Sequence, residues 1–391
     1  MTSKERVKAI LAGSIPDRVP WGEWAIDFDT VAHVIGHETF YRAKAKSQMA
    51  LWEGRRDEVI QSWKEDAIAF FRVMDCFDII NISAMASSIA PPKDYEWETP
   101  QKLDDTTWEF RDGTIMKYSP ATADMTVVHD PTVGTQTLSV EDFEKDPQPE
   151  KVDESCFEVI DALIAEFGNE RFMMGPSGHE VGIPLAGGSF EKGGGGFAYA
   201  LMQFYDNPEA VKAMARYEVV RNNMLDAVYI RPGQDGVAFG HQDFASTQSP
   251  FISPDMFREF AFPAIKERVR NVHEVYSLPV LKHACGNNNT LLDMFAEAGY
   301  DAYQSVQRTA GMDIGDIKRR YGHAFAPWGG VDVENLVSGT TEDVRKDVRY
   351  AMENYKEGGR YIFGSSHSIA VGTSYDNFMA MADEFDRLRD Y

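Results

Sequence analysis

The residues His283 and Cys285 are the clearest candidates for chemistry in this sequence. They stand in the motif His-Ala-Cys-Gly, at the end of an apolar run of strand length, residues 278–286. Two positions apart on a strand, an imidazole and a thiol project from the same face and can bind one metal ion. Nitrogen and sulfur ligation together favours zinc. The pair alone is a weak signal, because a histidine near a buried cysteine is more often a packing feature.

His367 is the candidate for a third ligand. It lies at the end of the last apolar run, residues 360–367, directly after a Gly-Ser-Ser stretch. Three protein ligands that leave a fourth position open are typical of catalytic rather than structural zinc. The sequence therefore predicts a catalytic zinc site formed by His283, Cys285 and His367.

Candidate acid–base groups stand at the ends of two other apolar runs. His241 and Asp243 share the two-residue spacing at the end of residues 235–243. Asp243 is interpreted as a general acid, with a zinc ligand, an orienting carboxylate and a loop cap as the alternatives. Glu180, which follows residues 171–178, has a similar claim.

Further polar and aromatic residues near predicted strand ends are candidates for substrate binding. Clustered aromatic side chains would suit a flat, apolar substrate, although core packing is their more common role. The residues are Trp24, Asp27, Phe28, Gln307 and Trp328.

The elements that must position these residues are eight short apolar runs, which mostly alternate with helical patterns. Alternation predicts a parallel sheet in an α/β fold, and eight strands close a (β/α)8 TIM barrel, whose active sites lie at the carboxyl ends of the strands. We expect one domain over residues 1–391. The predicted strands are 18–24, 75–83, 171–178, 235–243, 278–286, 301–307, 323–331 and 360–367. The main predicted helices are 53–73, 208–230, 254–276, 288–298, 340–356 and 375–388.

Two segments depart from the alternation. Residues 87–150 are interpreted as an insertion between the second and third strands that covers one mouth of the barrel, with a hairpin that turns at Asp112-Gly113. The glycine-rich stretch 187–197 lacks the spacing of a phosphate-binding loop, so it is predicted to be a mobile lid.

Composition excludes several classes of protein. The 39 basic and 62 acidic residues give a net charge of −23, which would repel nucleic acid. No apolar run is long enough to cross a membrane, and the first residues do not form a signal peptide. Three widely spaced cysteines do not make a disulfide framework, so a cytoplasmic location is expected. Whether the chain forms a homodimer is left open.

Four stretches resemble the uroporphyrinogen decarboxylase superfamily, in the order that this family shows. They are residues 1–20, 249–269, 283–307 and 328–350. The resemblance covers nearly the whole chain and implies a barrel fold. It also implies one of two activities, because the superfamily divides into porphyrinogen decarboxylases and zinc-dependent corrinoid methyltransferases.

The residues of this chain match the second branch better. The decarboxylases carry an arginine-rich segment after the first strand and a catalytic aspartate after the second, whereas here residues 23–28 contain no arginine and the second strand ends around Ser83. The methyltransferases carry His-x-Cys at the fifth strand, which His283 and Cys285 match, and a further cysteine at the eighth. His367 stands in place of that cysteine, and a site with one thiolate fewer is more electrophilic, which favours an oxygen-bearing substrate.

The leading hypothesis is a zinc-dependent methyltransferase. It would move a methyl group from a methylated small molecule, with a methoxylated aromatic as the first choice, to the cobalt of a cobalamin-type corrinoid carried by a partner protein. The alternatives are a metal-independent lyase that decarboxylates a smaller carboxylate, and a non-catalytic ligand-binding barrel.

Overall fold

A curled, seven-stranded parallel sheet forms the centre of the protein. The computed structural model describes residues 1–84, 89–132, 138–185 and 196–391. Neighbouring strands in the sheet follow one another in the order β1-β6-β7-β8-β9-β10-β11, and every pairing is parallel. The strands are β1 Ile79–Asn81, β6 Phe172–Gly175, β7 Gly236–Phe239, β8 Val280–His283, β9 Ala302–Gln304, β10 Ala326–Val331 and β11 Ile362–Ser365.

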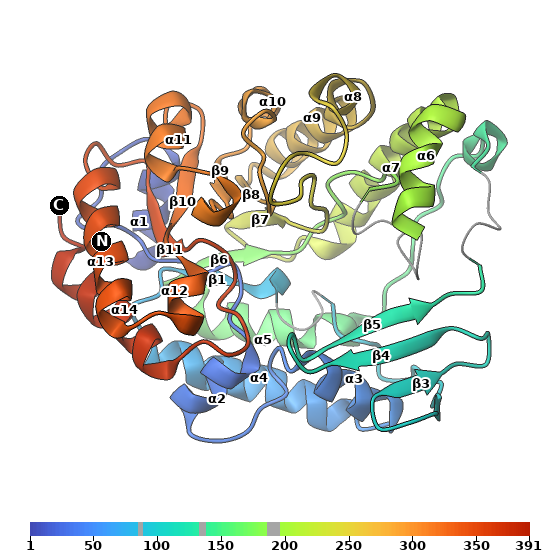
Figure 1. The fold of residues 1–391 in the computed structure, drawn as a ribbon, viewed down its shortest axis with the longest axis horizontal. Coiled ribbons are helices and arrows are strands. Elements are labelled where there is room, and N and C mark those ends of the chain that lie inside the picture. The colour runs from blue at the N-terminus through green and yellow to red at the C-terminus, as the bar shows by residue number, and fades with distance from the viewer. Residues whose placement is uncertain (85–88, 133–137, 186–195) are drawn as a thin grey trace.

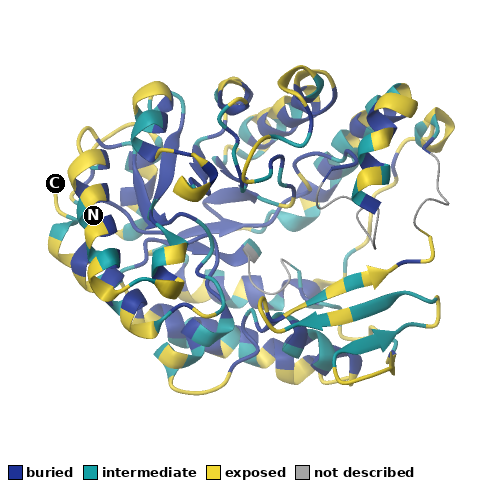
Figure 2. Cartoon of the chain, viewed as in Figure 1, coloured by how far each residue is buried: buried dark blue, intermediate teal, exposed yellow. Residues whose placement is uncertain are grey.

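Helices cover the outside of this sheet. In Figure 1, α3, α4 and α5 lie below the parallel strands and α8 to α11 lie above them. The strands are almost completely buried, as the dark blue of Figure 2 shows, because a parallel sheet is covered on both faces. The helices are α1 Ser3–Leu11, α2 Phe28–Ile35, α3 Lys44–Trp52, α4 Arg56–Val73, α5 Glu158–Phe167, α6 Gly196–Asp206, α7 Pro208–Tyr229, α8 Pro254–Phe260, α9 Phe262–Asn271, α10 Leu292–Ala298, α11 Ile314–Tyr321, α12 Val333–Ser338, α13 Thr341–Tyr355 and α14 Tyr375–Leu388.

The segment around Trp21 joins the two edges of the sheet. Trp21 forms a parallel bridge with Phe363 of β11, and its carbonyl accepts hydrogen bonds from the backbone N–H groups of Asp78 and Ile79. The fold is therefore α/β and TIM-barrel-like. The prediction of a continuous first strand over residues 18–24 was wrong. Pro20 has no N–H, and that of Trp21 donates to the Asp78 carboxylate at 2.9 Å, so the regular ladder is lost.

The predicted helix 254–276 is divided into three pieces. α8 ends at Phe260 and α9 begins at Phe262, and a π-helical turn follows over Val272–Tyr276. Pro263 explains the first break, because it offers no N–H to the preceding turn and its ring clashes there.

Apolar side chains fill the interior of the curled sheet. Alternate strand residues such as Ile79, Phe172 and Leu281 point inward into one buried cluster. Val7 and Ile10 belong to the same cluster, so α1 packs across the end at which the strands begin. The opposite end, where the strands finish, carries the polar residues described below.

A second, antiparallel sheet lies in the chain between β1 and β6. Its strands are β2 Gln101–Lys102, β3 Thr107–Glu109, β4 Ile115–Ser119 and β5 Asp124–His129. The hairpin predicted at Asp112-Gly113 joins β3 to β4, and β5 packs near α3. Residues 187–195 of the predicted lid lie outside the described residues, and residues 196 and 197 begin α6. Within the described part of the chain, none of the helices is both long enough and apolar enough to span a bilayer.

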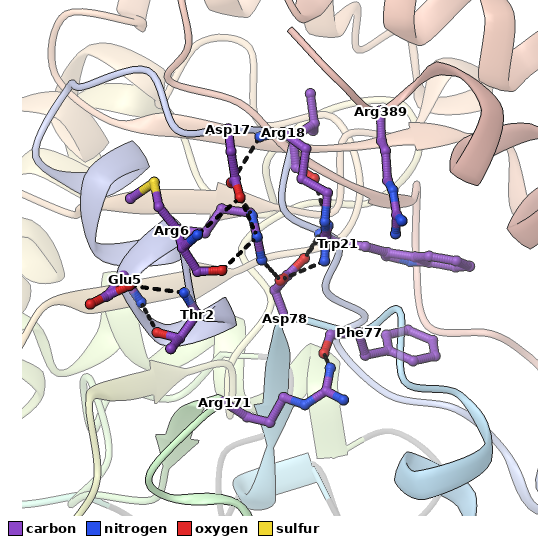
Figure 3. A network of polar contacts seen from close by, with 12 residues as sticks. Thr2, Glu5, Arg6, Asp17, Arg18, Trp21, Phe77, Asp78, Arg171 and Arg389 are labelled. Carbon is purple, nitrogen blue, oxygen red and sulfur yellow. Dashed lines mark hydrogen bonds and ion pairs between the residues drawn. The ribbon is translucent and has the colours of Figure 1, made fainter.

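A buried carboxylate ties α1, the Trp21 segment and β1 together (Figure 3). Asp78 is fully buried and accepts hydrogen bonds from Arg6 at 2.7 Å and from Arg18 at 2.7 Å, besides the N–H of Trp21. Arg6 also pairs with Asp17 at 2.7 Å. Buried charges are tolerated only when they are paired and hydrogen-bonded, and this network meets that condition.

We expect Asp78→Ala to lower the free energy of unfolding by about 3–5 kcal/mol, because the substitution removes one of the two carboxylate partners of the buried Arg6. Urea denaturation measures this change. Asp105→Ala, at an exposed carboxylate 3.1 Å from Lys102, is the matched control and should change stability by less than about 1 kcal/mol. Equal losses in the two variants would contradict this account of the network.

Candidate metal centre

The three predicted ligands come together at the ends of two strands. His283 is the last residue of β8 and Cys285 follows it, while His367 lies two residues beyond the end of β11. Cys285 Sγ is 3.1 Å from His283 Nε2 and 2.9 Å from His367 Nε2, and all three donor atoms lie within 4.8 Å of one another. Ligands at about 2.0–2.3 Å from zinc in a tetrahedron are separated by roughly 3.3–3.8 Å. The two distances to Cys285 Sγ are slightly shorter than this spacing, so the donor set fits a zinc ion after a small adjustment of the side chains.

The backbone at Gly286 lets the chain turn directly after Cys285. Its φ is +81°, a conformation that favours glycine. A Cβ at this position would lie 2.5 Å from the carbonyl oxygens of Ala245 and Ser246. The glycine of the His-Ala-Cys-Gly motif is thus required by the close approach of the loop that follows β7.

Gln304 orients the imidazole of His283. The strand register places Gln304 beside His283, and its Oε1 accepts a hydrogen bond from His283 Nδ1. This contact places the proton on Nδ1 and leaves Nε2 free to bind a metal. One face of the ring is covered by Trp24, which stacks on it with centroids 4.8 Å apart. Sequence analysis missed Gln304, although the pairing of neighbouring strand ends could have indicated it.

The electrostatic environment favours neutral ligands in the absence of a cation. Burial, followed by the nearby His367, lowers the pKa of His283 to about 3, and burial also lowers the pKa of His367. Both imidazoles are therefore neutral at physiological pH, as metal ligation requires. Burial, followed by the negative charge of Asp243, raises the pKa of Cys285 to about 12. A divalent cation is the partner that would stabilise its thiolate.

Asp243 lies against the ligand cluster, and the structure places the other two acid–base candidates in different contacts. Asp243 Oδ1 accepts a hydrogen bond from the backbone N–H of Cys285 at 2.7 Å. His241 has an exposed ring that stacks on His179, with centroids 4.6 Å apart. Glu180 is buried, in an ion pair with Lys282 at 2.5 Å and in contact with the Tyr300 hydroxyl.

Of the predicted substrate-binding residues, Trp24 and Gln307 contact the ligand-bearing elements. Trp24 stacks on His283, and Gln307 Oε1 accepts a hydrogen bond from the N–H of Gly286 at 3.1 Å. Trp328 is fully buried within the sheet, where its indole N–H donates to the carbonyl of Gly22 at 2.8 Å.

The two remaining candidates lie at the start of α2. Asp27 forms ion pairs with Arg42 at 2.9 Å and with Lys44 at 3.2 Å. Phe28 lines a surface groove of about 670 Å³ formed by residues of α2 and the loop after it. No hydrogen bond or ion pair joins these two described residues to the three metal-ligand candidates, although the negative charge of Asp27 is close enough to act on His367.

The fold is TIM-barrel-like, and its candidate metal ligands, two imidazoles and a thiol, lie at the strand ends. Residues 121–388 match the profile of the uroporphyrinogen decarboxylase (URO-D) family, and this match covers more than half of the chain. The chain belongs to that family.

Individual relatives agree with this assignment. Uroporphyrinogen decarboxylase 2 of Arabidopsis thaliana is 28% identical over 236 residues, which cover 58% of this chain and 56% of the relative. Uroporphyrinogen decarboxylase of Hordeum vulgare is 28% identical over 228 residues, covering 56% and 63%. The chain thus matches between half and two thirds of the length of these relatives. A solved methyltransferase from Methanosarcina mazei, 16% identical, covers 99% of both chains with a TM-score of 0.61, which shows the shared fold.

We expect Gln304→Leu to weaken zinc binding about 10- to 100-fold, the usual effect of removing the partner of a metal-binding histidine. Competition with a chromophoric chelator measures this affinity. Gln203→Leu, at a buried glutamine of α6, is the matched control and should bind zinc like the wild type. An unchanged affinity in Gln304→Leu would show that His283 needs no orienting contact.

Proposed function

We propose that this protein is a zinc-dependent methyltransferase that moves a methyl group from a methylated small molecule, most simply a methoxylated aromatic, to the cobalt of a corrinoid protein. The observation that carries the proposal is the cluster formed by His283, Cys285 and His367, with donor atoms within 4.8 Å of one another. Mixed nitrogen and sulfur ligation by three residues is the pattern of a catalytic zinc site with one open position.

The positions that match the substrate-binding segments of the decarboxylase branch carry different residues in this chain, and these residues make contacts within the protein. Where the decarboxylases carry their arginine-rich segment, this chain has the buried Glu23. Asp27, in the same segment, forms ion pairs with Arg42 and Lys44. At the end of β1 stands Asn81, whose amide donates to the carbonyl of Trp24 at 2.8 Å. These features support the methyltransferase branch over decarboxylation of a polyanionic porphyrinogen.

Each residue of the site has a separate task in the proposed reaction. Zinc bound by the three ligands would act as a Lewis acid on the ether oxygen. Transfer to cobalt(I) would leave the electron pair of the carbon–oxygen bond on the oxygen, which would then need a proton. Asp243 lies beside the ligands and would hold this proton. Gln304 and Trp24 keep the His283 ring in place.

The corrinoid partner would dock on the face at which the strands end, because cobalt must come within bonding distance of the methyl carbon. The antiparallel sheet β2–β5 lies in the chain between β1 and β6, and we propose that it borders this face. Shortening this sheet should then slow transfer to the corrinoid protein more than transfer to free cobalamin.

A metal-independent lyase that acts on a smaller carboxylate is the second candidate. The observation that favours it is the family itself, whose curated relatives named above are decarboxylases. The two candidates differ in their requirement for metal. Activity that survives complete removal of zinc would favour the lyase.

We expect one zinc per chain in the purified protein, and we expect Cys285→Ala to lose most of it, because one of three protein ligands is removed. Metal analysis by mass spectrometry gives the stoichiometry. Cys156→Ala removes a buried cysteine that lies far from the ligands in sequence, and this variant should retain zinc. The zinc-loaded wild type should convert cobalt(I) cobalamin to methylcobalamin with an aryl methyl ether, as absorbance would show. Transfer that is equally fast in Cys285→Ala would contradict the proposal.

We expect Asp243→Asn to lower turnover by about 10²–10⁴-fold, with zinc content and melting temperature unchanged. The asparagine keeps the oxygen that accepts the Cys285 N–H, so the loop is held, but it has no proton to give. Turnover, zinc content and melting on one preparation separate the roles. A fully active variant would exclude proton transfer by Asp243, and a loss of zinc would make Asp243 a ligand.

A further inference from the structure

The Glu23 side chain is a buried carboxyl group that the proposed reaction does not use. Only 4% of its surface is exposed. Its Oε1 accepts hydrogen bonds from the indole of Trp21 at 2.8 Å and from the backbone N–H of Ser365 at 3.0 Å. Burial raises the pKa of Glu23 to about 7, although these hydrogen bonds act in the opposite direction.

The hydroxyl of Ser365 lies between two oxygen atoms. Ser365 Oγ is 2.5 Å from Glu23 Oε2, and it also contacts the carbonyl oxygen of His367. A serine hydroxyl has one proton and can donate to only one of them. Both contacts are hydrogen bonds when Glu23 is a neutral acid, because its O–H then donates to Ser365 Oγ and the Ser365 hydroxyl donates to the carbonyl of His367.

The surroundings of Glu23 are consistent with the neutral acid. Trp21 and Ser365 are its hydrogen-bonding partners, and the titratable group near it is the buried phenol of Tyr361. In the parts of the chain that the structure describes, no lysine or arginine forms an ion pair with Glu23. A buried carboxylate without a cation is unfavourable, so protonation is the less costly state.

We propose that Glu23 is a positioning residue for the metal centre: as a neutral acid it donates to Ser365, and Ser365 in turn holds the backbone of His367. This inference rests on the proposed zinc site. The chain is already fixed on both sides of His367, since the N–H of Ser366 donates to Val331 at 2.7 Å and that of Ile369 donates to Ala25 at 2.9 Å. Ser365 supplies a further contact, at the backbone carbonyl of His367 itself.

The inference predicts a particular order of zinc affinities at about pH 6. Glu23→Gln should bind zinc within about 3-fold of the wild type, because the amide N–H donates to Ser365 Oγ as the acid does. Glu23→Ala should bind about 10- to 100-fold more weakly, the range expected for loss of an outer contact. Ser365→Ala should show the same loss and provides the test if Glu23→Ala does not fold.

The pH dependence separates positioning from simple packing. As the pH rises through 7, Glu23 ionises and becomes an acceptor only. The hydroxyl of Ser365 then donates its hydrogen bond to the Glu23 carboxylate, and its hydrogen bond to the carbonyl of His367 is lost. Zinc binding by the wild type should therefore weaken relative to Glu23→Gln between about pH 6 and 8.5. Ser366→Ala removes the neighbouring hydroxyl, which accepts from Val333 at 3.1 Å, and should follow the wild type at every pH.

Chelator competition on these variants is the experiment, together with the infrared band of a neutral carboxylic acid. The difference between the spectra of the wild type and Glu23→Gln at about pH 6 should contain that band. Wild-type affinity in Glu23→Ala and Ser365→Ala, or equal weakening in Glu23→Gln and Glu23→Ala, would overturn the inference. The predicted order of affinities without methyl transfer would support it and overturn the proposed function, whereas a wild type that binds no zinc would overturn both.

Discussion

The closure of the parallel sheet is the constraint on which the candidate metal centre depends. His283 and Cys285 follow β8, and His367 follows β11, so the ligands meet only because the sheet curls and its edges are joined through Trp21. This connection between the two edges depends on Asp78, whose carboxylate accepts the hydrogen bond of the Trp21 N–H in place of a neighbouring strand. A network at one end of the fold therefore stabilises the geometry at the other end, where the chemistry would take place.

Buried polar groups beside the ligands act on the site through hydrogen bonds. Gln304 bonds to the ring of His283, while Ser365 bonds to the backbone of His367. Lys282 and Glu180 neutralise each other, and Lys282 also donates to the carbonyl of Gln242, the residue before Asp243. Each contact fixes a ligand or its neighbour in advance, which lowers the entropic cost of assembling a metal site.

Sequence periodicity predicted the α/β class and the region of every parallel strand, because apolar runs of strand length are a direct consequence of burial on both faces. The sequence also indicated the ligand candidates, since two side chains two residues apart on a strand project from the same face.

The prediction of the first strand was wrong because the side chain of Asp78 takes the place of a backbone hydrogen-bond partner. Hydrophobic periodicity carries no information about such a replacement. Residues 254–276 are helical as predicted, but they form three pieces rather than one helix, and the first break follows from Pro263. Gln304 was missed because its role depends on the register of β8 and β9, which a single chain segment does not reveal. The position of Glu23 at a strand end was apparent, but its bond to Ser365 joins residues 342 positions apart.

X-ray absorption at the zinc edge of the loaded protein tests the central claim most directly, because it reports the atoms bound to the metal. The account predicts one sulfur neighbour at about 2.3 Å and two imidazole nitrogens at about 2.0–2.1 Å, with the remaining position taken by a light atom. The sulfur should disappear from the spectrum of Cys285→Ala. A zinc ion without any sulfur neighbour in the wild type, or one with only oxygen ligands, would contradict the account.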